Sequence, residues 1–176
     1  PLCFLPGTGT LRPLAWDLPV ASAQVKGALA LAALRAEGPS RIGGRIDSRD
    51  HTERMLGEGL GLGLRVAGGA LLVEPARAVP SFEIGVPGDV SSAAFFIAAS
   101  LVAGRELLVR GCGLNPTRLG FLEVVRRMGA GIDVTVEGTS LGEPWGTIRV
   151  VPGHLRGTTV APEEVPELID EVPLIA

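Results

Sequence analysis

The fold is decided by the segment ASAQVKGALALAAL, residues 21–34, in which small and apolar side chains occupy nearly every helical position. A helix that is apolar all round is typical of the interior of a layered structure, because no face of it favours water. Gly38 and Pro39 follow the segment and end it. The sequence therefore predicts an internal helix over residues 21–34.

The elements that follow this helix return in the same order farther along the chain. After the first helix, the hydrophobic pattern predicts a strand, a helix and a hairpin, at 41–46, 48–56, 62–66 and 70–73. A second copy starts with another apolar helix, and its segments are 90–102, 106–109, 115–128, 132–136 and 147–151. A third internal helix is predicted over 168–176. Such self-similarity indicates an internal repeat of a mixed α and β unit, so the fold class is α/β (α+β).

Helix-capping residues support these boundaries. Ser48 is expected to be the N-cap of the helix through Leu56, with acidic side chains near its positive end. Asn115 and Pro116 form the corresponding cap and first-turn pair in the second copy. Asp89 is expected to cap the helix over 90–102. The glycine-rich stretch 57–63 lacks the residues of a phosphate loop and is interpreted as a bend.

Composition narrows the classes of function. At 176 residues, with 46% hydrophobic residues and a mean hydropathy of +0.36, the chain can bury a substantial core. The formal net charge of -3 comes from interspersed acidic and basic residues, which gives no basic stripe for nucleic acid. The longest apolar runs, such as 93–102, fall far short of the about 20 residues of a membrane span. We expect a soluble protein with neither nucleic acid nor membrane as a partner.

The cysteines and histidines offer no metal or disulfide pattern. Cys3 and Cys112 lie singly among apolar neighbours, so both are expected to be small core residues in a reducing cytoplasm. His51 and His154 have no neighbours at metal-ligand spacing and are expected to be surface or capping residues. Lys26, the only lysine, stands one turn into the first helix. We assign it no phosphate, since its side chain could as easily point to solvent.

Two helix starts are candidate anion sites. In VASAQVK, residues 20–26, the helix start offers the hydroxyl of Ser22, unpaired backbone amides and the amide of Gln24. The alternative is an ordinary serine-capped core helix. In SRDHTERML, residues 48–56, Arg49 occupies a first turn that electrostatically prefers acids, and a bound anion would explain it. The alternative there is a solvated arginine paired with Asp50 or Glu53.

Five segments together resemble one known family. They are VASAQVK at 20–26, SRDHTERML at 48–56, PGDVSSAAFF at 87–96, RMGA at 127–130 and LIDEVP at 168–173. The chain resembles the bacterial branch of the 5-enolpyruvylshikimate-3-phosphate synthase (EPSP synthase) family, with the segments in that family's order across nearly the whole chain. The more usual serine of that family is replaced here by Gly27.

The resemblance implies the enolpyruvyl transferase fold, a two-domain inside-out barrel in which each domain contains three βαβαββ units packed around buried parallel helices. By this resemblance, residues 1–82 are the last unit of the first domain, and residues 83–176 are the first unit and the start of the second unit of the second domain. A hinge is expected near 82–88. This chain would then be a central part of the enzyme, without the segments that carry most of the phosphoenolpyruvate site.

The resemblance also implies an activity, the transfer of the enolpyruvyl group of phosphoenolpyruvate to the 5-hydroxyl of shikimate 3-phosphate. Ser22 and the backbone of Ala23 match the residues that hold the substrate phosphate, Gln24 matches an amide that touches both substrates, and Arg49 matches a residue of the shikimate 3-phosphate site. Asp170 matches an aspartate that binds the substrate hydroxyls and is the candidate base, although a helix N-cap is an equal reading of its sequence context. No metal or organic cofactor is implied.

Two alternatives remain open from the sequence. The related enolpyruvyl transferase that acts on UDP-N-acetylglucosamine shares the fold, but its characteristic segments are not found. A non-catalytic module that binds a phosphate ester is the other alternative, since a chain without the donor site can bind such an ester without converting it. The family resemblance leads us to expect a monomer in the cytoplasm.

Overall fold

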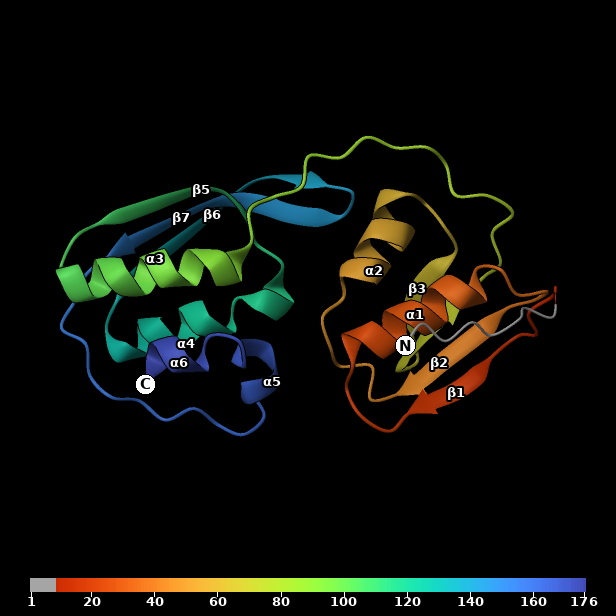
Figure 1. Ribbon diagram of the computed structural model, residues 1–176, viewed down its shortest axis with the longest axis horizontal. Coiled ribbons are helices and arrows are strands. Elements are labelled where there is room, and N and C mark those ends of the chain that lie inside the picture. The colour runs from red at the N-terminus through yellow and green to blue at the C-terminus, as the bar shows by residue number, and fades with distance from the viewer. Residues whose placement is uncertain (1–8) are drawn as a thin grey trace, which may run out of the picture. The chain divides into compact units, whose positions relative to one another are not determined.

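The computed structural model describes residues 9–176, and the chain divides into two compact units (Figure 1). The first unit ends at Phe82, and the second comprises Glu83–Ala176. Cys3 lies outside the described residues, so its predicted place in a core stays a prediction.

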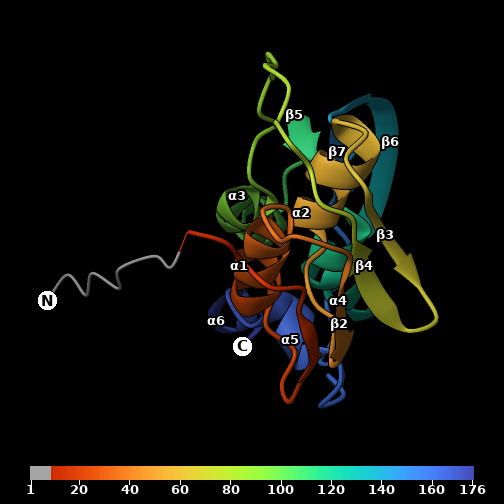
Figure 2. The same ribbon diagram turned by 90° about the vertical axis from the view of Figure 1, so that its right-hand side faces the viewer.

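The first unit is a single βαβαββ motif. Its elements are β1 (Ala15–Leu18), α1 (Ala23–Ala33), β2 (Ser40–Gly44), α2 (His51–Glu53), the π-helical η1 (Arg54–Gly59), β3 (Leu64–Ala67) and β4 (Ala70–Val73). The strands form a sheet in the order β1-β2-β4-β3, in which β1 and β2 are parallel and the other pairs are antiparallel. Figure 1 and Figure 2 show α1 and the α2–η1 helix on one face of this sheet. Because β1 and β2 are parallel, the chain must cross over the sheet between them, and α1 is that crossover.

Helix α1 buries only one of its apolar faces within the described residues. The buried face carries Lys26, Gly27, Ala30 and Ala33. On the other side, Val25 is 48% exposed and Leu31 is 54% exposed. The face toward the sheet is buried as predicted, whereas the opposite face is exposed in residues 9–176. Helix α3 shows the same pattern in the second unit, where Phe95 and Phe96 are exposed.

The second helix of the first unit begins later than predicted. Asp50, and not Ser48, holds its N-cap position, and no side chain caps it. The helix then continues in π-helical geometry past the predicted end at Leu56, as far as Gly59. A side chain at Gly57 would place its Cβ 2.6 Å from the carbonyl oxygen of Leu64, which explains a glycine where the helix packs on β3.

The second unit repeats the topology of the first. Its elements are α3 (Val90–Ala103), β5 (Leu107–Gly113), the 3-10 helix η2 (Pro116–Arg118), α4 (Gly120–Met128), β6 (Gly131–Ser140), β7 (Glu143–Val151), α5 (Val165–Leu168) and α6 (Val172–Ile175). The sheet order β5-β7-β6 matches β2-β4-β3. A single parallel bridge between Gly88 and Cys112 stands where the first unit has the β1–β2 pairing. The internal repeat predicted from the sequence is therefore confirmed.

Both units also close their hairpins in the same way. Gly68 and Gly69 turn the β3–β4 hairpin with φ values of 57° and 70°, and Leu141 and Gly142 turn the β6–β7 hairpin with φ values of 46° and 78°. Two successive residues with positive φ form the turn whose twist matches that of the strands. Leu141 is the non-glycine residue in this conformation, and a Cβ there is strained.

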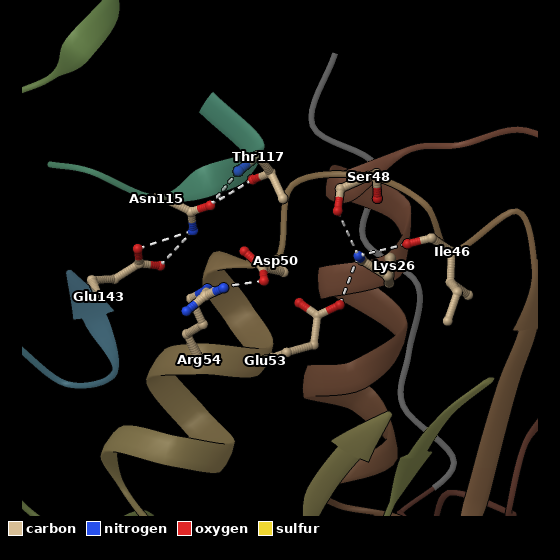
Figure 3. A network of polar contacts seen from close by, with 9 residues as sticks. All are labelled: Lys26, Ile46, Ser48, Asp50, Glu53, Arg54, Asn115, Thr117 and Glu143. Carbon is tan, nitrogen blue, oxygen red and sulfur yellow. Dashed lines mark hydrogen bonds and ion pairs between the residues drawn. The ribbon is translucent and has the colours of Figure 1, made fainter. Parts of the chain in front are cut away.

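The predicted cap of the helix over 115–128 is confirmed, although the helix is in two pieces, η2 and α4. Asn115 is 3% exposed, and its Oδ1 accepts hydrogen bonds from Thr117 N at 2.9 Å and Thr117 Oγ1 at 2.7 Å. Its Nδ2 donates to Glu143 Oε2 at 3.0 Å (Figure 3). Asn115 therefore joins the start of η2 to the start of β7.

The predicted helix over 168–176 is also divided. It consists of α5 and α6, with residues 169–171 forming the break between them. Pro173 lies in the first turn of α6, where its missing N–H costs nothing, but it cannot continue a helix from α5. Among the described residues, no helix has the length and apolar composition needed to cross a membrane.

Candidate functional site

The start of α1 has the geometry of an anion site. Ser22 is extended, with φ of -138° and ψ of 109°, and its Oγ accepts a hydrogen bond from Val25 N at 3.3 Å. The first helical hydrogen bond runs from Lys26 N to Ser22 O at 3.0 Å. The amides of Ala23 and Gln24 precede that bond and point out of the helix end. The first turn of α1 contains no acidic residue, so no carboxylate of that turn competes for the positive end of the helix.

Gln24 and Ser22 lie at this helix end with different exposures. The side chain of Gln24 is exposed, whereas Ser22 and Ala23 are half-buried. A serine oxygen that accepts the Val25 amide still has its own proton to donate. Three predicted site residues are thus brought together, with a hydroxyl donor, backbone amides and a side-chain amide at one helix end.

Arg49 lies in the loop between β2 and α2 and is half-buried. Because α2 begins at His51, Arg49 is outside the first helical turn and directly precedes the N-cap residue Asp50. The two acids named as its alternative partners each contact a basic residue in the structure. Asp50 Oδ2 accepts from Arg54 Nε at 2.9 Å, and Glu53 Oε1 lies 2.7 Å from Lys26 Nζ.

Lys26 is buried, so the expectation of a side chain that could point to solvent is wrong. Its side chain lies on the face of α1 that packs inside the unit, and it contacts the loop before Arg49 (Figure 3). The sequence contained one signal for this position. Lys26, Gly27, Ala30 and Ala33 share the helical spacing of a buried face, and a lysine on such a face requires an acidic partner.

Asp170 lies in the second unit, in the turn between α5 and α6. Its side chain is 54% exposed, and its Oδ2 is 3.8 Å from Arg118 Nη1. The alternative reading as an N-cap is wrong, because Glu171 holds the N-cap position of α6. Sequence reasoning missed Arg118, whose side chain is only 13% exposed and also donates to Asp89 Oδ1 at 3.2 Å and to Ser91 Oγ.

Asp89 is the N-cap of α3, as predicted. Its carboxylate accepts from Ser91 N at 3.3 Å and from Ser92 N and Ser92 Oγ at 3.0 Å each. Burial tends to raise the pKa of this carboxyl, but the hydrogen bonds from Ser92 and Ser91 and the positive charge of Arg118 outweigh it. The pKa of Asp89 therefore lies below its ordinary value, and the cap is ionised at neutral pH.

In residues 9–176 the cysteine is buried and both histidines are exposed. Cys112 is 1% exposed, and burial, together with the negative charge of Asp89, raises the pKa of its thiol. A protonated buried thiol is a core residue and not a nucleophile, so the prediction for Cys112 is confirmed. His51 and His154 are exposed. In residues 9–176, no group of three or more histidine, cysteine, aspartate or glutamate side chains has a metal-binding arrangement.

Comparisons with known proteins agree with this architecture. The family model of EPSP synthase (3-phosphoshikimate 1-carboxyvinyltransferase) matches residues 4–176. Similar relatives include the 3-phosphoshikimate 1-carboxyvinyltransferases of Bacillus licheniformis, 43% identical over 96% of this chain, and of Chloroflexus aurantiacus, 48% identical over 94% of it. This chain spans 39% of the length of each of these relatives.

Solved structures show the same likeness. The EPSP synthase of Acinetobacter baumannii superposes with a TM-score of 0.83 and 37% sequence identity, over 93% of this chain and 37% of that one. At 37% identity, the two proteins are similar in sequence as well as in fold. The chain belongs to the EPSP synthase (3-phosphoshikimate 1-carboxyvinyltransferase) family.

Proposed function

We propose that this chain contributes the shikimate 3-phosphate site of a 3-phosphoshikimate 1-carboxyvinyltransferase. The reaction joins phosphoenolpyruvate to the 5-hydroxyl of shikimate 3-phosphate and gives 5-enolpyruvylshikimate 3-phosphate and inorganic phosphate. The observation that carries the proposal is the start of α1, where Ser22, Ala23 and Gln24 present donors at a helix end in a member of this family. A doubly charged phosphate ester is the kind of ligand that such an end binds.

The phosphate of shikimate 3-phosphate is held by Ser22 Oγ–H and the amide of Ala23. Gln24, whose side chain is exposed, reaches from the same helix end toward both substrates. Arg49 supplies a planar pair of N–H donors from the loop before α2, and such a fork binds phosphate or carboxylate with two parallel hydrogen bonds. Neutral donors and one guanidinium thereby bind the dianion without a metal ion.

Asp170 is the proposed base toward the 5-hydroxyl. As the hydroxyl oxygen attacks C2 of phosphoenolpyruvate, the carboxylate of Asp170 accepts its proton, and a general acid of the phosphoenolpyruvate site donates a proton to C3, which completes a tetrahedral adduct. The conjugate base of that acid then removes a proton from C3 as the C2–O bond to phosphate breaks, which regenerates the double bond and releases inorganic phosphate. The position of Asp170 in an exposed turn beside Arg118 is compatible with contact to a substrate hydroxyl.

The proposal extends to the organisation of the protein. We place residues 1–82 as the last unit of one domain and residues 83–176 as the first unit, and the start of the second, of the next domain. Phosphoenolpyruvate is the second substrate, and no organic cofactor takes part. We propose a monomeric protein in the cytoplasm.

Calorimetric titration of shikimate 3-phosphate into the full-length gene product tests the site. Arg49→Ala should weaken binding by about 10- to 150-fold, because a hydrogen bond to a charged group contributes about 1.5–3 kcal/mol. Arg45→Ala is the matched control. It removes the same charge from the same loop, but Arg45 is 61% exposed and paired with Asp47 at the surface.

The control should bind within about twofold of the wild type, as expected for a surface ion pair. Inorganic phosphate should compete with the ester in the wild type and in Arg45→Ala. Equal affinities of the Arg49 and Arg45 variants, or a wild type that binds neither shikimate 3-phosphate nor phosphate, would refute the proposed site.

A further inference from the structure

The ammonium group of Lys26 has a protein partner for each of its protons. Lys26 is 2% exposed, and its Nζ donates to the carbonyl oxygens of Ile46 at 3.0 Å and Ser48 at 3.2 Å. It also forms an ion pair with Glu53 Oε1 at 2.7 Å (Figure 3). An ammonium group has three donors, so none remains for a substrate. The side chain is therefore a cross-link within the protein.

The same residue is bonded to both segments of the candidate site. The backbone amide of Lys26 donates to the carbonyl oxygen of Ser22, the residue that begins α1, at 3.0 Å. Its Nζ holds the carbonyl oxygen of Ser48, and Arg49 is the next residue in the chain. Lys26 thus ties the amide-bearing start of α1 to the loop that carries the guanidinium.

Stability alone does not explain this arrangement. Taking an ammonium and a carboxylate out of water carries a large desolvation penalty, and apolar residues of similar volume often stabilise a fold equally well or better. The contacts also leave polar atoms unsatisfied, since Glu53 Oε2 and Ser48 Oγ are buried without a hydrogen-bond partner among the described residues. Because the contacts of Lys26 are directional and cost stability, they favour a role for Lys26 in fixing the local backbone geometry.

We propose that Lys26 is a positioning residue for shikimate 3-phosphate binding, which rests on the function proposed above. By fixing the carbonyls of Ile46 and Ser48, its ammonium holds the 46–48 loop so that Arg49 faces the ligand bound at the start of α1. Lys26 does not touch the ligand. The effect is preorganisation, because a donor that is already in place loses less conformational freedom on binding.

The decisive variant replaces the whole buried pair. Lys26→Met alone leaves the Glu53 carboxylate buried without its counter-charge and could unfold the unit. Lys26→Met combined with Glu53→Met keeps the volume and removes both charges, so that no buried charge is left unpaired, and it should fold with a urea midpoint near that of the wild type. Lys26→Arg retains the charge and should retain part of the binding, since a guanidinium can still reach one carbonyl and the carboxylate.

Gly27→Ala is the matched control for packing between α1 and α2. A Cβ at Gly27 would lie 2.9 Å from Thr52 Oγ1, so this variant disturbs the same helix pair without removing any Lys26 contact. If Lys26 only held the helices together, the control and the double methionine variant would affect shikimate 3-phosphate binding equally.

Two measurements on the full-length gene product test the proposal. One is amide hydrogen exchange over residues 46–50, and the other is the steady-state KM for shikimate 3-phosphate. In the double methionine variant we expect faster exchange in this loop and a KM for shikimate 3-phosphate raised about 10- to 100-fold, as for a misplaced binding group. The KM for phosphoenolpyruvate should change little. Gly27→Ala should leave the exchange of the loop and the KM near wild-type values.

Wild-type KM for shikimate 3-phosphate in the folded double variant, or unchanged exchange over residues 46–50, would overturn the positioning role. A wild-type protein that binds no shikimate 3-phosphate, while the double variant still shows faster exchange, would instead overturn the proposed function and keep the cross-link. The two failures are therefore distinguishable.

Discussion

Replacing Ser22 by alanine should have two separable effects, one on stability and one on ligand binding. The stability effect comes from the lost N-cap, for which alanine costs about 0.5–2 kcal/mol. The bond from Val25 N to Ser22 Oγ is long at 3.3 Å and exposed, so we expect a loss near the lower end, about 0.5–1 kcal/mol. The binding effect comes from a hydroxyl that donates to a charged phosphate oxygen. Its loss should weaken shikimate 3-phosphate binding by about 10- to 150-fold.

Ser22→Gly and Ser22→Thr separate the two effects. Glycine at an N-cap costs only a few tenths of a kcal/mol, but it lacks the hydroxyl, so Ser22→Gly should be nearly as stable as the wild type and bind as weakly as Ser22→Ala. Ser22→Thr keeps a hydroxyl that can both cap and donate, and it should retain stability and binding. Urea denaturation and calorimetric titration measure the two quantities in the same preparation.

Comparing affinity with stability across the three Ser22 variants tests whether the hydroxyl binds the phosphate. Affinity that follows stability, with Ser22→Gly binding as tightly as the wild type, would show that the hydroxyl only caps the helix. The phosphate would then have to be held elsewhere.

Two further predictions concern the second unit. Asp89→Asn keeps a good capping residue and removes the charge. Because the pKa of Asp89 is depressed in the folded protein, its contribution is present above the unfolded-state pKa and lost as the pH falls through the folded-state pKa. Wild type should therefore have the higher urea midpoint at pH 7, and the difference should disappear once the pH has fallen below the lowered folded-state pKa; a constant difference would contradict this. Leu141→Asn should stabilise the unit by about 1 kcal/mol, because asparagine tolerates the positive φ of 46°. Leu141→Ala, which has no side-chain amide to hydrogen-bond locally in this conformation, should show no such gain in thermal denaturation.

Local signals in the sequence predicted most of the fold. The order of elements, the repeat and both hairpins follow from hydrophobic periodicity and glycine positions, which act over a few residues. The caps at Asp89 and Asn115 were predicted correctly because a cap bonds residues two or three positions away. The family resemblance carried by the five motifs is confirmed by the family match.

The errors arose where distant residues decide the structure. Ser48 has the right side chain for an N-cap, but its carbonyl is held by Lys26 from another helix, and α2 begins only at His51. Lys26 itself is buried because Glu53, far along the chain, supplies the counter-charge. The helical spacing around Lys26 signals a buried face, but the residues next to Lys26 and Ser48 do not reveal which distant partner each contacts. Arg118 was missed for the same reason, since its partners belong to α3 and to the turn after α5.

The burial of the only lysine has a practical consequence. A protease that cleaves only after lysine has one possible cut in this chain, at the Lys26–Gly27 bond inside α1. That bond becomes accessible only when the first turns of the helix open, so the cleavage rate reports the population of the opened form. Comparing the rate with and without shikimate 3-phosphate would measure how strongly a ligand closes this helix end, without any label or substitution.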